Sequence, residues 1–220
     1  MAGCAFFDIT LTGEGAHGVR PDESIDPVLI ACQIGTALQS IVARNIAPQK
    51  TAVLSVTRIQ AGEGYNVIPQ TAKLSGTVRT MKRKSMALVE ANMKRLAANI
   101  ATGFGAEAST DFRVISAPLV NDVRHAQAFA DAAAELVTEA RVNRNMPPAN
   151  VSDDFSFMLE KVPGAYITLG NGENSAPVHN PDYNFNDAAI PYGTALFARI
   201  VERELATTVG EPIDAKRPST

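Results

Sequence analysis

The most constraining feature of the sequence is its hydrophobic periodicity, which switches from a period of two to a helical period and back. The run "AFFDITLTGEG" (5–15) alternates apolar and polar residues before two glycines, which is typical of a strand. The run "PVLIACQIGTALQSIVARN" (27–45) follows Asp26, a good N-cap, and starts with Pro27, a good first helical residue. It predicts an amphipathic helix whose buried stripe comprises Val28, Ala31, Ile34, Leu38, Ile41 and Val42.

Four further segments extend this pattern. They are β-rich runs at 51–62 and 71–81, a helix at 85–105 that stops at Gly103 and Gly105, and an alternating run at 106–117. The order strand, helix, strand, strand, helix, strand is the ferredoxin-like, split-βαβ arrangement of an α+β fold. Four antiparallel strands with both helices on one face leave the other face or an edge strand open. A second copy can protect such an edge by pairing with it, so a homodimer is expected.

The pattern breaks at "SAPLVND" (116–122), and the second part of the chain is richer in helices. Its predicted elements are helices at 125–141, 152–164 and 186–206 and one buried strand at 165–172. One strand is too few to build an α/β layer, so this part is predicted to belong to a domain whose other strands lie elsewhere. The polar, proline-bearing end at 207–220 is predicted to be disordered.

The composition excludes several classes of function. A net charge of −3 over 220 residues gives no basic surface for nucleic acid or for an anionic membrane. No secretory signal precedes the first strand, and no apolar run reaches the roughly 20 residues of a membrane span. Cys4 and Cys32 lack a Cys-x-x-Cys spacing, as expected for reduced thiols, so the sequence favours a soluble, cytoplasmic protein.

Two groups of polar residues in the first part have chemical potential. His17 follows glycines in "GAHGVRP", where the backbone can approach a ligand closely and an imidazole donor suits developing negative charge. Asn66 and Arg79 belong to neighbouring predicted strands, where an amide and a guanidinium fork can clamp a carboxylate. The alternative for all three is a structural role, as a solvated loop histidine, a turn asparagine and an exposed strand arginine.

The third group lies in the loop "TLGNGENSAPVHNPDYNFND" (168–187). Its His179 is flanked by prolines and suits zinc or a similar ion. A metal site needs three or four ligands, and no histidine or cysteine lies nearby in the sequence. The neighbouring acids, Asp153, Asp154, Asp182 and Asp187, show no standard metal spacing. The residues therefore offer one candidate ligand and an incomplete site, while His125 is expected to cap a helix or to be solvated.

Taken together, seven motifs occur in one order: "GEGAHGVRP…DPV", "ALQSIVAR", "AGEGYNVIP", "GTVRTM", "SDDFSF", "VPGAYITLGNG" and "VHNPDYNFND". From about residue 3 to 205 the chain resembles the metal-dependent amidohydrolases of the aminoacylase and carboxypeptidase group of zinc peptidases. It is most similar to hippurate hydrolases and indole-acetyl-amino-acid hydrolases. The resemblance implies a ferredoxin-like dimerisation (lid) domain at 1–115 and the C-terminal part of a zinc-peptidase-like catalytic domain at 116–206, followed by the tail at 207–220.

The resemblance also implies a role for each candidate residue. His17 matches the lid histidine that reaches the partner subunit's active site and stabilises the amide oxyanion. Asn66 and Arg79 match lid positions that grip the substrate, notably its carboxylate. Gly170 matches the loop that faces the substrate, and His179 matches the last ligand of a divalent metal, zinc or manganese.

Two departures and one missing part qualify the resemblance. Asp22 stands where the close relatives usually have a second histidine, and Asp153 stands where they usually have a glutamate before Asp154 and Phe155. Nothing in the chain matches the N-terminal half of the family, which carries most metal ligands and the glutamate general base. We therefore expect the C-terminal part of an amidohydrolase for small N-acyl amino acids, inactive by itself. A non-catalytic homodimerisation module is the alternative.

Overall fold

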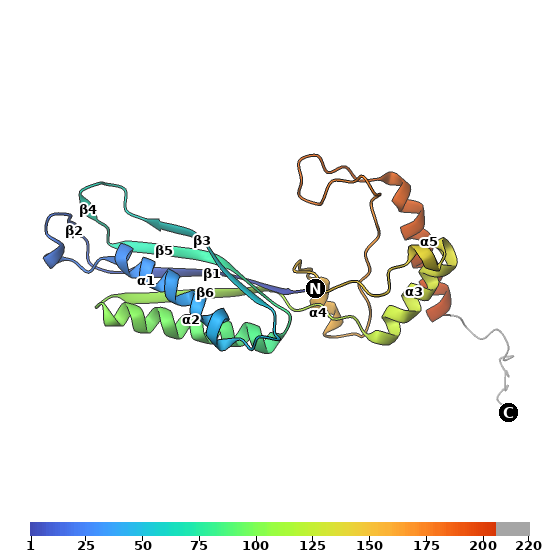
Figure 1. The fold of residues 1–220 in the computed structure, drawn as a ribbon, viewed down its shortest axis with the longest axis horizontal. Helices are drawn as coiled ribbons and strands as arrows, with labels where there is room; N and C mark the ends of the chain where they lie inside the picture. The colour runs from blue at the N-terminus through green and yellow to red at the C-terminus, as the bar shows by residue number, and fades with distance from the viewer. Residues whose placement is uncertain (206–220) are drawn as a thin grey trace, which may run out of the picture. The chain divides into compact units, whose positions relative to one another are not determined.

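The computed structural model describes residues 1–205, which divide into two compact units (Figure 1). Unit 1 comprises Met1–Val120 and Pro147–Val162, and unit 2 comprises Asn121–Met146 and the described residues from Pro163 onward. The predicted tail at 207–220 lies outside the described residues. Segment 147–162 packs within unit 1, although the predicted boundary at residue 115 assigns it to the second part of the chain. The assignment of 116–206 to a catalytic domain stays a prediction.

Unit 1 is built on a four-stranded sheet with strand order β3-β5-β1-β6, in which every pair is antiparallel. The elements follow the predicted order strand, helix, strand, strand, helix, strand, and both helices run along the sheet (Figure 1). Their bounds are β1 Gly3–Thr12, α1 Pro27–Ser40, β3 Ala52–Ala61, β5 Thr71–Thr80, α2 Arg83–Gly103 and β6 Glu107–Ser116, with a π-helical turn, η2 Ile41–Asn45, after α1.

The N-terminus of α1 confirms the predicted cap. The Asp26 carboxylate accepts hydrogen bonds from the Val28 and Leu29 backbone N–H groups, and Pro27 occupies the first turn. The predicted buried stripe is wrong at Val28, which is 37% exposed, and Ile30 takes its place in the core. At 3.6 residues per turn Val28 lies about 120° around the helix from Ile34, whereas Ile30 lies only about 40° away.

The core of unit 1 lies between the sheet and its two helices. Alternate residues of β1 and β5 enter it together with the apolar faces of α1 and α2; its largest fully buried members include Phe7, Ile9, Leu11, Ile34, Leu38, Leu74 and Met93. Gly76 makes this packing possible, because a Cβ atom there would lie 2.0 Å from the Ser55 carbonyl oxygen and 2.5 Å from the Phe7 ring. The glycine at this position of β5 thus leaves the space in which the Phe7 ring packs against the strand backbone.

One described stretch, Pro27–Asn45, is long and apolar enough by length and composition to cross a membrane. The hydropathy of the sequence predicts no such stretch. Ile30, Ile34 and Leu38 are nevertheless fully buried in the core of unit 1, at the spacing of a helix that packs on a sheet. This stretch is accounted for as a core helix of unit 1.

Unit 2 contains α3 Val123–Val137 and α5 Ile190–Glu204, with the short 3-10 helices η3 Glu139–Arg141 and η4 Asp187–Ala189. The short helix α4 Phe155–Leu159 belongs to unit 1. The predicted strand at 165–172 is wrong, since these residues form no strand in the described structure. A strand needs a neighbouring strand for its backbone hydrogen bonds, and unit 2 supplies none among its described residues.

Candidate functional site

His17 and Asn66 lie together on a small projection of unit 1 that we call the arm, comprising residues 13–20 and 62–70. Its two short strands, β2 Ala16–His17 and β4 Val67–Ile68, pair antiparallel, with His17 opposite Val67. The Gly18 N–H donates to the Asn66 carbonyl oxygen at 2.7 Å. The sequence predicts only a turn at 63–70, because two-residue strands carry no readable periodicity.

The base of the arm is held by Gln70. Its side-chain amide donates to the Gly13 carbonyl oxygen at 2.6 Å, and the Gly13 N–H donates to the Gln70 carbonyl oxygen at 3.0 Å. These bonds join the end of β1 to the start of β5. The arm that carries the exposed His17 and Asn66 is therefore attached to the sheet at its base.

The environment of the His17 ring selects one neutral tautomer. The Val19 backbone N–H donates to Nδ1 at 3.2 Å, so in the neutral ring the proton resides on Nε2. Nε2–H then remains available as a hydrogen-bond donor on the exposed side of the arm. This is the form that a stabiliser of negative charge requires.

Asp22, at the position where the resemblance leads us to expect a second histidine, lies in the short helix η1 Pro21–Glu23 that follows the arm. Its carboxylate is 3.5 Å from the Arg20 guanidinium, which also pairs with Glu23. Both Asp22 and Arg20 are more than half exposed. Asp22 thus belongs to a solvated ion-pair group rather than to a buried site.

Arg79 lies near the opposite end of β5 from the arm and is half-buried. Its Nη1 donates to the Ser152 hydroxyl at 2.7 Å, and no carboxylate among the described residues pairs with it. The other half-buried basic side chain, Lys73, pairs with Asp8 at 3.2 Å. Among the described residues, Arg79 is thus a half-buried basic side chain without an anionic partner. This lack of a partner favours a role for Arg79 in binding an anion.

One copy of the chain does not bring Arg79 together with His17 and Asn66. Arg79 pairs with Cys4 near the start of β1, whereas the arm follows the end of β1 at Thr12. Eight strand residues separate these positions, or about 26 Å at 3.3 Å per residue. The carboxylate clamp of Asn66 and Arg79 that their sequence positions suggest does not form within a single copy.

Gly170 and His179 belong to unit 2, in a loop that Asn171 closes at its base. The Asn171 amide nitrogen donates to the Asn184 carbonyl oxygen at 2.8 Å, and its amide oxygen accepts from the Asn186 N–H at 2.7 Å. A Cβ atom on Gly170 would meet nothing within 4 Å, so open space lies beside the chain there. Asn171 is not among the predicted site residues, although its position between two glycines at the start of a long loop could have indicated it.

His179 has an unusual backbone conformation. It is the third residue of a turn closed by the Asn180 N–H and the Pro177 carbonyl oxygen at 3.1 Å, and its φ is +68°. A histidine in the left-handed region costs roughly 1 kcal/mol or more, and such residues cluster at functional sites. The strained backbone supports His179 as a site residue independently of its chemistry.

The described residues do not form a metal site by themselves. No group of three or more His, Cys, Asp or Glu side chains that could hold a metal ion occurs in residues 1–205. His179 remains the single candidate ligand, and one ligand does not fix a divalent ion. No reaction step through a metal can therefore be derived from this chain.

His125, the third histidine, has a structural role at the start of α3. Its Nδ1 lies 2.7 Å from the Asp122 carboxylate, which also accepts from the His125 backbone N–H at 3.1 Å. These two hydrogen bonds, the side-chain one first, hold the pKa of Asp122 below its usual range. Asp122 is the N-cap of the helix, and His125 supports it.

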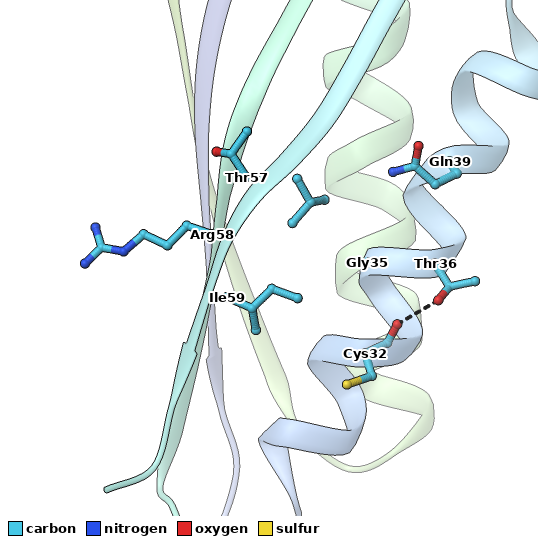
Figure 2. A pocket seen from close by; sticks show the side chains of 8 residues that line it. Cys32, Gly35, Thr36, Gln39, Thr57, Arg58 and Ile59 are labelled. Atoms are coloured by element: carbon cyan, nitrogen blue, oxygen red, sulfur yellow. Dashed lines mark hydrogen bonds between the residues drawn. The ribbon is translucent and has the colours of Figure 1, made fainter.

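The edge strand β3 borders a groove against α1 (Figure 2). Cys32, Gly35, Thr36 and Gln39 line it from the helix, and Val56, Thr57, Arg58 and Ile59 line it from the strand. In Figure 2 the Ile59 side chain points toward α1, while Arg58 points to the other side of the strand. Beyond β3 no described strand pairs, so its outer backbone groups are available to another chain.

Comparison with known proteins assigns the family. Residues 6–203 match the model of Peptidase family M20/M25/M40. The chain belongs to this family. It is 36% identical to the N-acetylcysteine deacetylase of Bacillus subtilis strain 168, over 97% of this chain and 54% of that protein.

Two further relatives agree with this M20 assignment. The hippurate hydrolase of Campylobacter jejuni is 31% identical over 93% of this chain and 53% of its own length. The crystal structure of the Bacillus subtilis YXEP protein, described as a dinuclear metal binding peptidase, superposes with a TM-score of 0.72 at 31% identity, over 94% of this chain and 51% of that one. The chain thus spans about half the length of the relatives that it matches.

Proposed function

We propose that this chain is the lid and C-terminal catalytic part of a dimeric, metal-dependent amidohydrolase acting on small N-acyl amino acids. Hydrolysis would add water across the amide bond and release a carboxylate and a free amino acid. The proposal rests on the M20 membership and on relatives named as a deacetylase and a hippurate hydrolase. It includes a ferredoxin-like lid, for which the βαββαβ order and the strand order of unit 1 are the support.

The observation that carries the proposal is the arm. It carries the exposed His17, whose neutral ring keeps its proton on Nε2, beside Asn66 on a pair of short antiparallel strands. When water attacks an amide carbonyl, negative charge develops on the oxygen, and a preorganised donor such as His17 stabilises it. Asn66 would hold the substrate next to this donor through its amide.

A second copy of the chain would complete the site. Arg79, the proposed grip on the substrate carboxylate, lies about 26 Å along the sheet from the arm of its own copy. One small substrate cannot span this distance, so the arm that serves Arg79 would come from a partner subunit. The open edge of β3 and its groove against α1 offer a surface for the dimer contact.

His179 would be one ligand of a divalent metal, zinc or manganese, which would supply a water nucleophile when bound in the complete enzyme. Its other ligands and the general base would come from the half of the relatives that the chain does not cover. The chain alone is therefore expected to turn over no N-acyl amino acid. We propose a cytoplasmic location and no nucleic-acid or membrane partner.

The shared site can be tested by complementation in a full-length enzyme that carries this chain behind the N-terminal half of the Bacillus subtilis N-acetylcysteine deacetylase. His17→Ala should lower kcat on N-acetyl and N-benzoyl amino acids by 10²-fold or more, and Arg79→Ala should raise KM. At substrate concentrations well below the parent KM, where both variants are slow, mixing them should restore about a quarter of the parent rate, because half of randomly mixed dimers are heterodimers with one intact site of two. Failure of the mixture to recover contradicts the shared site.

The non-catalytic homodimerisation module remains the second candidate, because the exposed β3 edge of unit 1 favours it. Ile59→Asp in the groove should dissociate the dimer in light scattering, with Ile115→Asp on β6, at the other edge of the sheet, as the matched control. If the dimer forms but the full-length enzyme hydrolyses no N-acyl amino acid, the module is the correct function. Hydrolysis that depends on His17 excludes it.

A further inference from the structure

The segment around Ser152 is fastened to unit 1 at three points. The Ala2 N–H donates to the carbonyl oxygens of Ala149 and Val151, both at 3.0 Å. Further along, Glu160 accepts two hydrogen bonds from the Arg83 guanidinium. Between these contacts the Ser152 hydroxyl receives the Arg79 Nη1–H at 2.7 Å.

The Ser152 hydroxyl is important because, within the described residues, it is the hydrogen-bond partner of the Arg79 side chain. A guanidinium has five N–H donors, and a bidentate carboxylate uses two of them. One donor held by Ser152 restricts the positions that the guanidinium can take and leaves four donors for a ligand. Ser152 removes no charge from Arg79, since a hydroxyl is neutral, so the anion-binding capacity of Arg79 is kept.

We propose that Ser152 is a positioning residue that orients the Arg79 guanidinium to receive the substrate carboxylate. This rests on the proposed function, in which Arg79 grips the carboxylate of an N-acyl amino acid. The Arg83–Glu160 pair and the Ala2 contacts act indirectly, because they hold the backbone on either side of Ser152 against unit 1. The sequence separates Ser152 from Arg79 by 73 residues, so only the tertiary contact reveals the pairing.

The test measures carboxylate binding by the chain itself through isothermal titration calorimetry, and ¹⁵N-arginine labelling follows the Arg79 Nε–H signal in the chains that keep Arg79. The probes are N-benzoylglycine and N-methylbenzamide, which lacks the carboxylate. We expect N-benzoylglycine alone to shift the Arg79 signal, Ser152→Ala to weaken its binding about fivefold to tenfold, and Ser152→Thr to restore it by keeping the hydroxyl. Glu160→Gln should weaken binding less than Ser152→Ala does.

If Ser152→Ala keeps the parent affinity and Arg79→Ala abolishes binding, the positioning role of Ser152 is wrong, whereas the carboxylate grip of Arg79 stands. Unchanged affinity in Arg79→Ala, or no binding by the parent chain, overturns the proposed carboxylate grip and the role of Ser152 with it. In the full-length enzyme, Ser152→Ala should raise KM for N-acyl amino acids with little change in kcat. An equal fall of kcat on substrates with and without a carboxylate contradicts positioning and indicates a purely structural role.

Discussion

The two units of this chain fold by different means. Unit 1 has a continuous apolar core between a sheet and two helices, in which large side chains such as Phe7, Leu38 and Met93 are fully buried. In unit 2 the buried hydrophobic residues among those described are Ala132, Ala165 and Ala189. Because burial of apolar area is the dominant favourable term in folding, unit 1 has a source of stability that unit 2 lacks.

In unit 2 the two long helices, α3 and α5, are joined by ion pairs between charged side chains. Glu135 on α3 pairs with Arg199, at 2.9 Å, and with Arg203, both on α5. All three are exposed, and exposed ion pairs each contribute at most about 1 kcal/mol. Beside them, α5 and its C-cap residue carry a stripe of exposed apolar residues, comprising Ile190, Phe197, Val201 and Leu205. The comparison shows that two units of one chain can differ greatly in the buried apolar surface that stabilises each of them.

The largest expected effect comes from making the same type of substitution, phenylalanine to alanine, once in each unit. Phe7→Ala should lower the free energy of unfolding of unit 1 by about 3–5 kcal/mol, because Phe7 is fully buried against Gly76. Phe197→Ala should change stability by less than about 0.5 kcal/mol, because Phe197 is 70% exposed. Urea unfolding followed by circular dichroism measures both. Similar losses in the two variants mean that unit 2 has a core after all.

An intermediate effect compares the two helix caps. Asp26→Ala removes the acceptor for two N–H groups of α1 and should cost unit 1 about 1 kcal/mol. Asp122→Ala at α3 should leave the urea transition of unit 1 unchanged and speed hydrogen exchange in α3 alone. Asn at either position is the control, because it keeps the cap. A shift of the unit 1 transition by Asp122→Ala contradicts independent units.

The smallest effect is a pH dependence. Hydrogen bonds from Ser75 at 2.6 Å and from Arg113 at 2.7 Å, aided by Lys73, hold the pKa of Asp8 well below its usual range. A lowered pKa means that the ionised form stabilises the fold at neutral pH, and that this contribution of about 1 kcal/mol is lost as the pH falls below about 4. Asp8→Asn should flatten the acid limb of the unit 1 stability curve.

The matched control for this pH dependence lies in unit 2. Hydrogen bonding by Arg144 also lowers the pKa of Glu139, but that carboxylate is exposed and screened by solvent. Glu139→Gln should therefore leave the acid limb as it is. An equal flattening by both variants indicates a general charge effect rather than the Asp8 contacts.

Local signals predicted much of the fold correctly. The alternation in β1, the cap at Asp26 and the glycine stop of α2 lie within a few residues of the elements that they specify, so short-range physics decides them. The strand expected at 165–172 failed for the opposite reason. Its apolar residues favour a strand, but a strand forms only with a partner, which no local pattern can supply.

The candidate site divides in the same way. The sequence by itself determined the residue types, such as a histidine after glycines and a strand arginine, and the ordered motifs from which their roles are proposed. Only the tertiary structure decided that His17 joins Asn66 on the arm, that Arg79 lies at the far end of the sheet, and that Ser152 holds it. Contacts between residues far apart in sequence depend on the packing of whole elements, and that packing is a property of the assembled core.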